Sequence, residues 1–311
     1  MDRFRKIAGY VALGVATFFF FIYLIFPYGI LKEALTLKAS ELSGYNIAVG
    51  ELKIRFPLGI ELSNIDVSSQ KAEKLELTKV SADISLLSLL IGNLTTSLYV
   101  LDKKGGTVQT KISFGLFSFL FQNNALPHYA FVKAVDFGVG PVLGFLLAVA
   151  RDSDAVSPLA KPLFESMKIG AKLNAAIEMD INSTHFQKSE GKLLINLKEL
   201  NLHSLTENIP IPDQQFSKAL ITTELKGGIM QVDKNSGFTS NDLNLAISGQ
   251  ITQKPEFTNS LIDLKLDLEV GKALQEHLGF ILDAIAQKET SGKMQIKIHG
   301  TLSPAPSVSF Q

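Results

Sequence analysis

The chain has 311 residues, no cysteine, no tryptophan, 46% hydrophobic residues and a formal net charge of zero. The lack of cysteine excludes disulfides, thiolate zinc sites and cysteine nucleophiles. The balanced charge argues against a nucleic-acid-binding protein, which usually carries a basic excess on one face. The length suits one large domain or two small ones.

A single membrane anchor is predicted at the N-terminus. Residues 7–31 carry no charge, and about 20 apolar residues suffice to span a bilayer as a helix. The basic residues Arg3, Arg5 and Lys6 precede this run, so the positive-inside rule places the first six residues in the cytoplasm and residues 32–311 outside it. The alternative is a cleaved signal peptide, but the apolar run is longer than a usual signal core and no small-x-small site follows it.

Most of the remaining chain predicts β-strands, after a short helix expected at residues 32–44. In LIDLKLDLEV, for example, Leu264, Leu266 and Leu268 share one face and charged residues share the other. One dry and one wet face is typical of an antiparallel sheet that is exposed on one side. No βαβ alternation appears, which argues against a parallel sheet. Strands are predicted within residues 45–56, 56–68, 75–86, 95–112 (two, around Gly105-Gly106), 172–181, 191–202, 219–225, 229–234, 243–252, 260–270 and 292–302.

Two segments break this pattern. Residues 272–287 have apolar residues at helical spacing and predict a helix that packs on the sheet, with a membrane or partner contact as the alternative. Residues 114–168 predict a helical, apolar insertion, which includes the uncharged run 137–150. That run is short for a membrane-spanning helix. It is interpreted as a buried or groove-filling helix, with an interfacial segment or a second span as alternatives.

Catalytic chemistry is not predicted. The five histidines have no metal-ligand spacing, and the chain has neither a G-x-S-x-G motif nor a P-loop. Asp263 and Asp267 lie about 13 Å apart along a predicted strand, too far to share a proton. The glycine pairs 105–106 and 227–228 suit hairpin turns. We therefore expect no enzyme activity, no catalytic or metal-binding residues and no cofactor.

The order of the strand motifs resembles a known family. FPLGIELSNIDVS and KLELTKVSADISLLSLLIGNLTTSLYVLDKKGGTVQ are similar to the amino-terminal pattern of AsmA-like proteins. GKLLINLKELNL, IPIPDQQFSKALITTELKGGIMQV, LNLAISGQITQKPEFTNSLIDLKLDL and SGKMQIKIHGTLSPAPSVSF resemble the type II secretion system protein N (GspN) family, as does the anchor ending in FPYGILKEAL. The resemblance covers nearly the whole chain, and its strength lies in the order of individually weak motifs.

This resemblance implies a mainly β fold, in which an N-terminal transmembrane helix is followed by a long curved antiparallel sheet with a few packing helices. The sheet would form a trough or an open barrel. It also implies a non-enzymatic, single-pass inner-membrane component of the type II secretion machinery, with its bulk in the periplasm and other secretion subunits as partners. The alternative function is an AsmA-like lipid-binding or lipid-transfer protein that holds acyl chains in a hydrophobic groove.

Candidate site residues follow from the alternation of apolar residues along the strands and from the apolar insertion at residues 114–168. FPLGIELSNIDVS is expected to line the concave interior near the bilayer end, and Pro57 places its strand near the open margin of the sheet. The candidate groove-lining residues are Ile54, Phe56, Leu58, Ile60, Leu62, Leu264, Leu266 and Leu268. The candidate groove or membrane contacts are Phe114, Phe117, Phe119, Phe121, Phe145 and Leu146.

Overall fold

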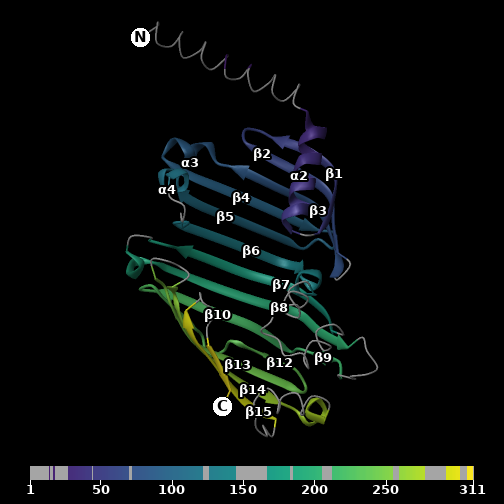
Figure 1. Ribbon diagram of the computed structural model, residues 1–311, viewed down its shortest axis with the longest axis vertical. Coiled ribbons are helices and arrows are strands. Elements are labelled where there is room, and N and C mark those ends of the chain that lie inside the picture. The colour runs from purple at the N-terminus through teal and green to yellow at the C-terminus, as the bar shows by residue number, and fades with distance from the viewer. Residues whose placement is uncertain are drawn as a thin grey trace.

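A computed structural model of the chain contains one 16-stranded sheet in which every paired strand is antiparallel (Figure 1). Strands β1 to β8 follow one another in chain order, and β10, β11, β13, β14, β15 and β16 continue the sheet. The structure describes residues 27–43, 45–69, 72–121, 126–144, 167–182, 185–204, 212–254, 259–276, 292–301 and 307–310, together with Gly14 and Thr17.

The two longest strands, β7 and β8, have 14 and 15 residues and lie in the middle of the sheet. The strands are β1 (Asn46–Arg55), β2 (Gly59–Ser69), β3 (Ala72–Ile84), β4 (Asn93–Asp102), β5 (Thr107–Gly115), β6 (Tyr129–Gly138), β7 (Met167–Asp180), β8 (Glu190–Ser204), β9 (Gln214–Gln215), β10 (Lys218–Lys226), β11 (Ile229–Val232), β12 (Gly237–Thr239), β13 (Leu243–Thr252), β14 (Leu261–Val270), β15 (Lys293–Thr301) and β16 (Ser307–Phe310). The helices are α2 (Tyr28–Ser43), α3 (Leu86–Leu90), α4 (Leu116–Phe121) and the 3-10 turn η1 (Phe186–Lys188), and residues 140–144 and 272–276 are also helical.

The prediction of a mainly β, antiparallel fold is confirmed, and so is the hairpin turn at Gly105-Gly106. The helix expected at residues 32–44 is α2, which begins earlier, at Tyr28. The insertion expected at 114–168 was wrong in one respect, because it contains the strand β6. Of the helix expected at 272–287, the described residues cover only 272–276, which are helical.

Of the predicted membrane anchor, residues 7–31, the structure describes only Gly14, Thr17 and residues 27–31. Within the part of the chain that the structure describes, no helix is both long enough and apolar enough to cross a membrane. The anchor over residues 7–31 therefore stays a prediction from the sequence.

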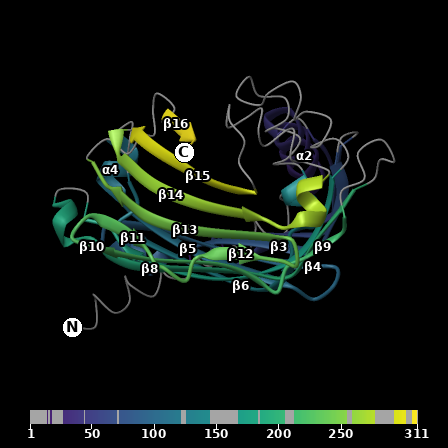
Figure 2. The ribbon, with the colours of Figure 1, turned by 90° about the horizontal axis from the view of Figure 1, so that it is seen from below.

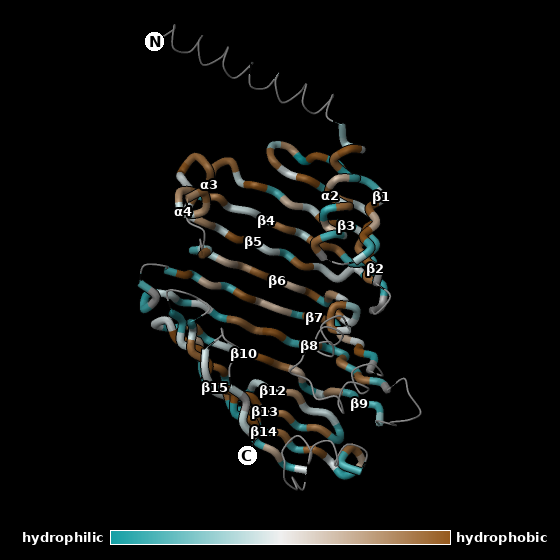
Figure 3. The backbone as a smooth tube through the Cα atoms, in the orientation of Figure 1, coloured by the Kyte–Doolittle hydropathy of each residue, from teal (hydrophilic) through white to brown (hydrophobic). Residues whose placement is uncertain are grey.

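The sheet is strongly curved, so that it has a concave and a convex side (Figure 2). Apolar and polar residues alternate along its strands (Figure 3). Successive side chains of a strand point to opposite faces. Helix α2 lies inside the curve of the sheet and packs against β1, where the apolar residue Leu52 is buried, so the apolar set lies on the concave side. On β7, for instance, Ala175 and Ile177 are less exposed than Ala176 and Glu178 between and beyond them. The convex face carries ion pairs such as Arg55–Asp83 and Lys79–Glu61.

Irregular residues keep the apolar face continuous along the long strands. Asn64, Asp136 and Glu199 have positive φ values of 52°, 47° and 52°. The register shifts beside Asp136 and Glu199, and a further shift lies between Leu77 and Lys79 on β3. Each β-bulge adds one residue to a strand. The apolar residues beyond the bulge thereby return to the concave side.

Candidate functional site: an apolar trough with a basic notch

The concave face forms a largely apolar surface, which we call the trough. One row of directly paired residues crosses nine neighbouring strands, from β1 to β10. It contains Leu52, Leu62, Val80, Val100, Val108, Ala134, Ala175, Ile195 and Ile221. In the C-terminal strands, Ile247, Leu266 and Ile296 continue the same pattern.

The described helices leave the centre of the trough open. Helix α2 packs against the edge strand β1, while α3 and α4 contact β4 and β5. Side chains such as Val132, Ile177 and Leu193 on the central strands are consequently neither buried nor fully exposed. A large apolar surface that no described element covers is typical of a site for an apolar ligand or a partner.

Most of the predicted groove residues lie in this trough. Ile54, Ile60 and Leu62 are on its first two strands, and Leu264, Leu266 and Leu268 are on β14, all in register with the apolar rows. Phe56 and Leu58 differ, because they lie in the turn between β1 and β2 together with Pro57. The side chain of Phe56 is 79% exposed and does not line the trough.

The aromatic residues predicted as groove or membrane contacts lie near one end of β5. Phe114 pairs with Leu94 at the end of that strand, and its ring lies 5.5 Å from the ring of Phe119. Phe117 and Phe121 on α4 form a second ring pair at 4.8 Å. Phe145 and Leu146 fall outside the described residues.

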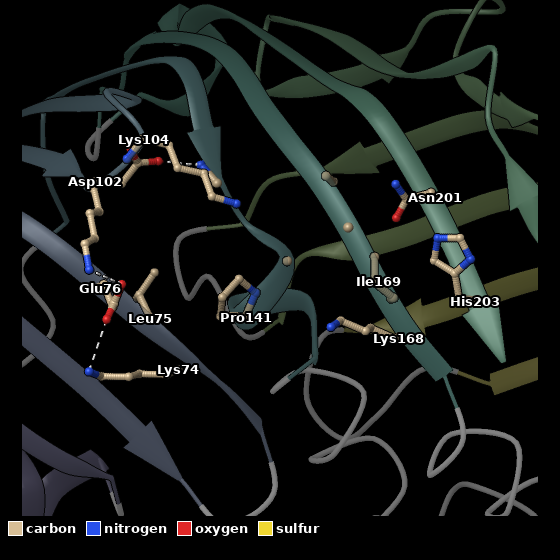
Figure 4. A pocket seen from close by; sticks show the side chains of 15 residues that line it. Lys74, Leu75, Glu76, Asp102, Lys104, Pro141, Lys168, Ile169, Asn201 and His203 are labelled. Carbon is tan, nitrogen blue, oxygen red and sulfur yellow. Dashed lines mark hydrogen bonds and ion pairs between the residues drawn. The ribbon is translucent and has the colours of Figure 1, made fainter. Parts of the chain in front are cut away.

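A notch of about 700 Å³ opens at the opposite ends of these strands (Figure 4). The hairpin between β4 and β5 is short there, whereas β3 on one side and β7 with β8 on the other side extend further. The notch is lined by the residues Lys74, Leu75, Glu76, Asp102, Lys103, Lys104, Gly138, Gly140, Pro141, Lys168, Ile169, Gly170, Ala171, Asn201 and His203. No sequence motif marks it, because five separate strands and their connections contribute to it.

The lining of the notch is predominantly basic. The carboxylate of Glu76 accepts hydrogen bonds from Lys103 Nζ at 2.8 Å and from Lys74 Nζ at 3.2 Å. These hydrogen bonds, and most of all the one from Lys103, lower the pKa of Glu76 below its usual range. Four lysines and two carboxylates, Glu76 and Asp102, line the notch, and Lys74 is also paired with Asp66 at 3.0 Å. His203 also lines the notch and places its Nδ1 2.9 Å from Asp213.

The notch joins polar chemistry to the apolar trough. Leu75 and Ile169, which pair with Val67 and Leu202, belong to the apolar face, and Lys168 and His203 are neighbours on the convex face. A ligand in the notch could therefore contact apolar side chains and cationic groups at once.

The described part of the chain contains no group of three or more histidine, aspartate or glutamate side chains that could hold a metal ion. His299 lies 3.8 Å from Asp263 on the exposed convex side of β14 and β15, which is an ordinary surface position. His277 lies outside the described residues.

Comparisons with known proteins identify no relative. No protein-family model, no curated protein and no solved structure matches the chain.

Proposed function

We propose that the trough holds the acyl chains of a lipid, and that the protein is an AsmA-like, membrane-anchored lipid-binding or lipid-transfer protein. The observation that carries the proposal is the row of paired apolar residues that crosses nine strands without an interruption. Acyl chains are long and apolar, and they need a surface that is continuous in the direction across the strands. Burying apolar area on this scale is favourable at about 25 cal/mol per Å².

The basic notch supports an amphiphilic ligand with an anionic headgroup. Lys104 and Lys168 line the notch together with Leu75 and Ile169 of the trough. A phosphate or carboxylate group in the notch would interact favourably with the ammonium groups, while its chain extends along the apolar face. The predicted anchor and the predicted periplasmic location would bring the trough to the outer surface of the inner membrane.

Site-specific photo-crosslinking in cells tests the trough directly. A photoreactive phenylalanine analogue replaces Val132 on β6 or Ile177 on β7, which are paired with each other on the concave face. The matched controls replace their convex neighbours, Lys133 and Ala176, which are also paired. We expect lipid adducts, detected by mass spectrometry, at the two concave positions and not at the two convex ones.

The controls decide between a trough and general contact with lipid. Equal lipid adducts at all four positions would mean nonspecific exposure to membrane. Absence of lipid adducts at Val132 and Ile177, in protein that carries the normal β circular dichroism signal, would contradict the proposal.

As a second candidate, we propose an accessory role in the type II secretion apparatus at the inner membrane. The order of the strand motifs, which resembles that of the type II secretion system protein N family, supports this role. It predicts contact with other secretion subunits. Crosslinking from the convex position Leu194, which is 41% exposed, should then recover a secretion subunit. Recovery of none from this and other convex positions would count against the role, without affecting the lipid hypothesis.

A further inference from the structure

Three connections between strands lie on the same edge of the sheet and expose large apolar side chains. In an antiparallel sheet of sequential strands, the β1–β2, β3–β4 and β5–β6 connections all fall on one edge. They are the turn at residues 56–58, helix α3 with the residues after it, and helix α4. Helices α3 and α4 lie side by side in Figure 1, and the backbone N–H of Leu116 donates to the carbonyl of Gly92 at 2.8 Å. We call these three connections the apolar margin.

The side chains of the apolar margin are unusually exposed for their type. Six of them have exposed fractions between 71% and 82%. They are Phe56, Leu87, Leu90, Ile91, Phe117 and Phe121. Monomeric soluble proteins rarely gather so many apolar side chains on one contiguous surface, so this margin requires a partner that is itself apolar.

The charge of the chain changes sharply at this margin. Residues 84–101 and 112–127 contain no charged side chain. The β4–β5 connection, on the opposite edge, carries Lys103 and Lys104 and belongs to the basic notch. On the edge of the apolar margin, the later β7–β8 connection is polar, with Asn182 and Lys188. The apolar connections are therefore confined to one corner of the sheet.

The chemistry of this corner favours a lipid bilayer over a protein surface. Protein interfaces combine an apolar centre with hydrogen-bonding groups and a polar rim. Here three separate tips present phenylalanine, leucine and isoleucine with a few serines, and the ion pair Arg55–Asp83 lies beside the β1–β2 turn. Apolar tips of this kind suit shallow insertion among lipid headgroups and the upper acyl chains.

The position of the corner agrees with this partner. Helix α2 begins at Tyr28, within the last residues of the uncharged run 7–31. In Figure 1, α2, α3 and α4 all lie in the half of the molecule formed by the first strands, with α2 on one edge of the sheet and α3 and α4 on the other. A bilayer that holds the predicted anchor would thus lie next to the apolar margin.

We propose that the apolar margin inserts into the surface of the bilayer from which the chain is suspended. Ile84 and Phe114, at the ends of β3 and β5, connect the margin to the apolar rows of the trough. The inserted margin would place the end of the trough against the acyl region of the membrane. This docking is independent of whether the trough itself carries lipid.

The absence of tryptophan from the chain allows a clean test. The variant Phe117→Trp places a single fluorophore on α4, and Leu87→Trp places one on α3. Leu194→Trp, on the convex face of β8, is the matched control. Each full-length variant is reconstituted into phosphatidylethanolamine–phosphatidylglycerol vesicles, with or without lipids brominated on their acyl chains. Circular dichroism verifies that each variant keeps the β signal of the natural protein.

We expect blue-shifted emission for both margin variants and at least twofold quenching by brominated lipid, with red-shifted, unquenched emission for Leu194→Trp. Unquenched, water-exposed emission at both margin positions would overturn the proposal. A blue shift that brominated lipid does not quench, and that grows with the density of protein in the vesicle, would also overturn it, because a second copy would then cover the margin. The photo-crosslinks at Val132 and Ile177 report on the trough separately.

Discussion

Asp102 Oδ2 accepts a hydrogen bond from the backbone N–H of Gly138 at 2.8 Å, although 36 residues separate the two. The other oxygen, Oδ1, accepts the backbone N–H groups of Lys104 and Gly106 at 2.8 and 2.7 Å. The Asp102 side chain is only 5% exposed. One carboxylate thus joins the β4–β5 hairpin to the end of β6 and fixes one wall of the basic notch.

Replacement of Asp102 by alanine should therefore destabilise the protein strongly. It leaves three backbone N–H groups without their acceptor, and we expect a loss of about 2–4 kcal/mol in the free energy of unfolding. Urea unfolding followed by circular dichroism measures this loss. The control is Asp83→Ala, which removes an exposed ion pair with Arg55 and should cost about 1 kcal/mol or less. Similar losses for the two variants would mean that the contacts of Asp102 are not structural.

The sequence predicts a strand well where one face of that strand is polar and exposed to solvent. In residues 75–86, the apolar alternation slips once, and the structure has a β-bulge between Leu77 and Lys79 at that place. Strand β6 escapes prediction because Phe131 and Val135 are apolar although they lie on the convex face. The apolar residues on both faces of β6 conceal the alternation of apolar and polar residues, so the sequence predicts this segment as part of an apolar insertion.

The functional surfaces are only partly predictable for a physical reason. Trough residues such as Ile60 and Leu266 follow from alternation along a single strand. The notch depends on where strands of different length end, since Lys74, Lys104 and Lys168 meet only through tertiary pairing. Phe56 continues the alternation of its neighbours, but it lies in the turn between β1 and β2.

Asp136 occupies a bulge with a φ of 47°, and its Oδ1 accepts Asn174 Nδ2 at 2.8 Å and Lys198 Nζ at 3.3 Å. A β-branched residue adopts positive φ only at a considerable cost, whereas glycine does so readily. We therefore expect Asp136→Val to be less stable than Asp136→Gly by about 1–2 kcal/mol. Thermal and urea unfolding of the two variants measure the difference, and equal stability would argue against the bulge.

The free energy of unfolding should depend on pH in the acidic range because of the ionisation of Glu61. Lys79 lies 2.6 Å from its carboxylate and Arg55 lies 3.9 Å away. The hydrogen bond from Lys79, followed by the charges of Lys79 and Arg55, lowers the pKa of Glu61 below the usual 4.5. Because the folded state holds this group ionised, its contribution is complete above that usual value and is lost as the pH falls through the lower pKa of the folded protein.

The variant Glu61→Gln removes this acid-dependent contribution. We expect the natural protein to lose more stability than the variant between about pH 5 and pH 3. Glu33→Gln, on the exposed helix α2, removes the same charge without such a partner and serves as the control. If Glu61→Gln and the natural protein follow parallel curves of stability against pH, the ion pair with Lys79 has no energetic role.

The basic notch predicts a preference for anionic lipids that a single charge reversal should reduce. Lys104 lines the notch, and two unit charges 4 Å apart in water interact with about 1 kcal/mol, so reversing one charge changes the interaction by about 2 kcal/mol. We therefore expect Lys104→Glu to lower the ratio of bound anionic to zwitterionic lipid by about 30-fold, as measured by native mass spectrometry after incubation with an equimolar mixture. The control is Lys297→Glu, on the exposed convex face of β15, because it changes the net charge equally. An identical change in the lipid ratio for both variants would assign the preference to net charge and contradict a role for the notch.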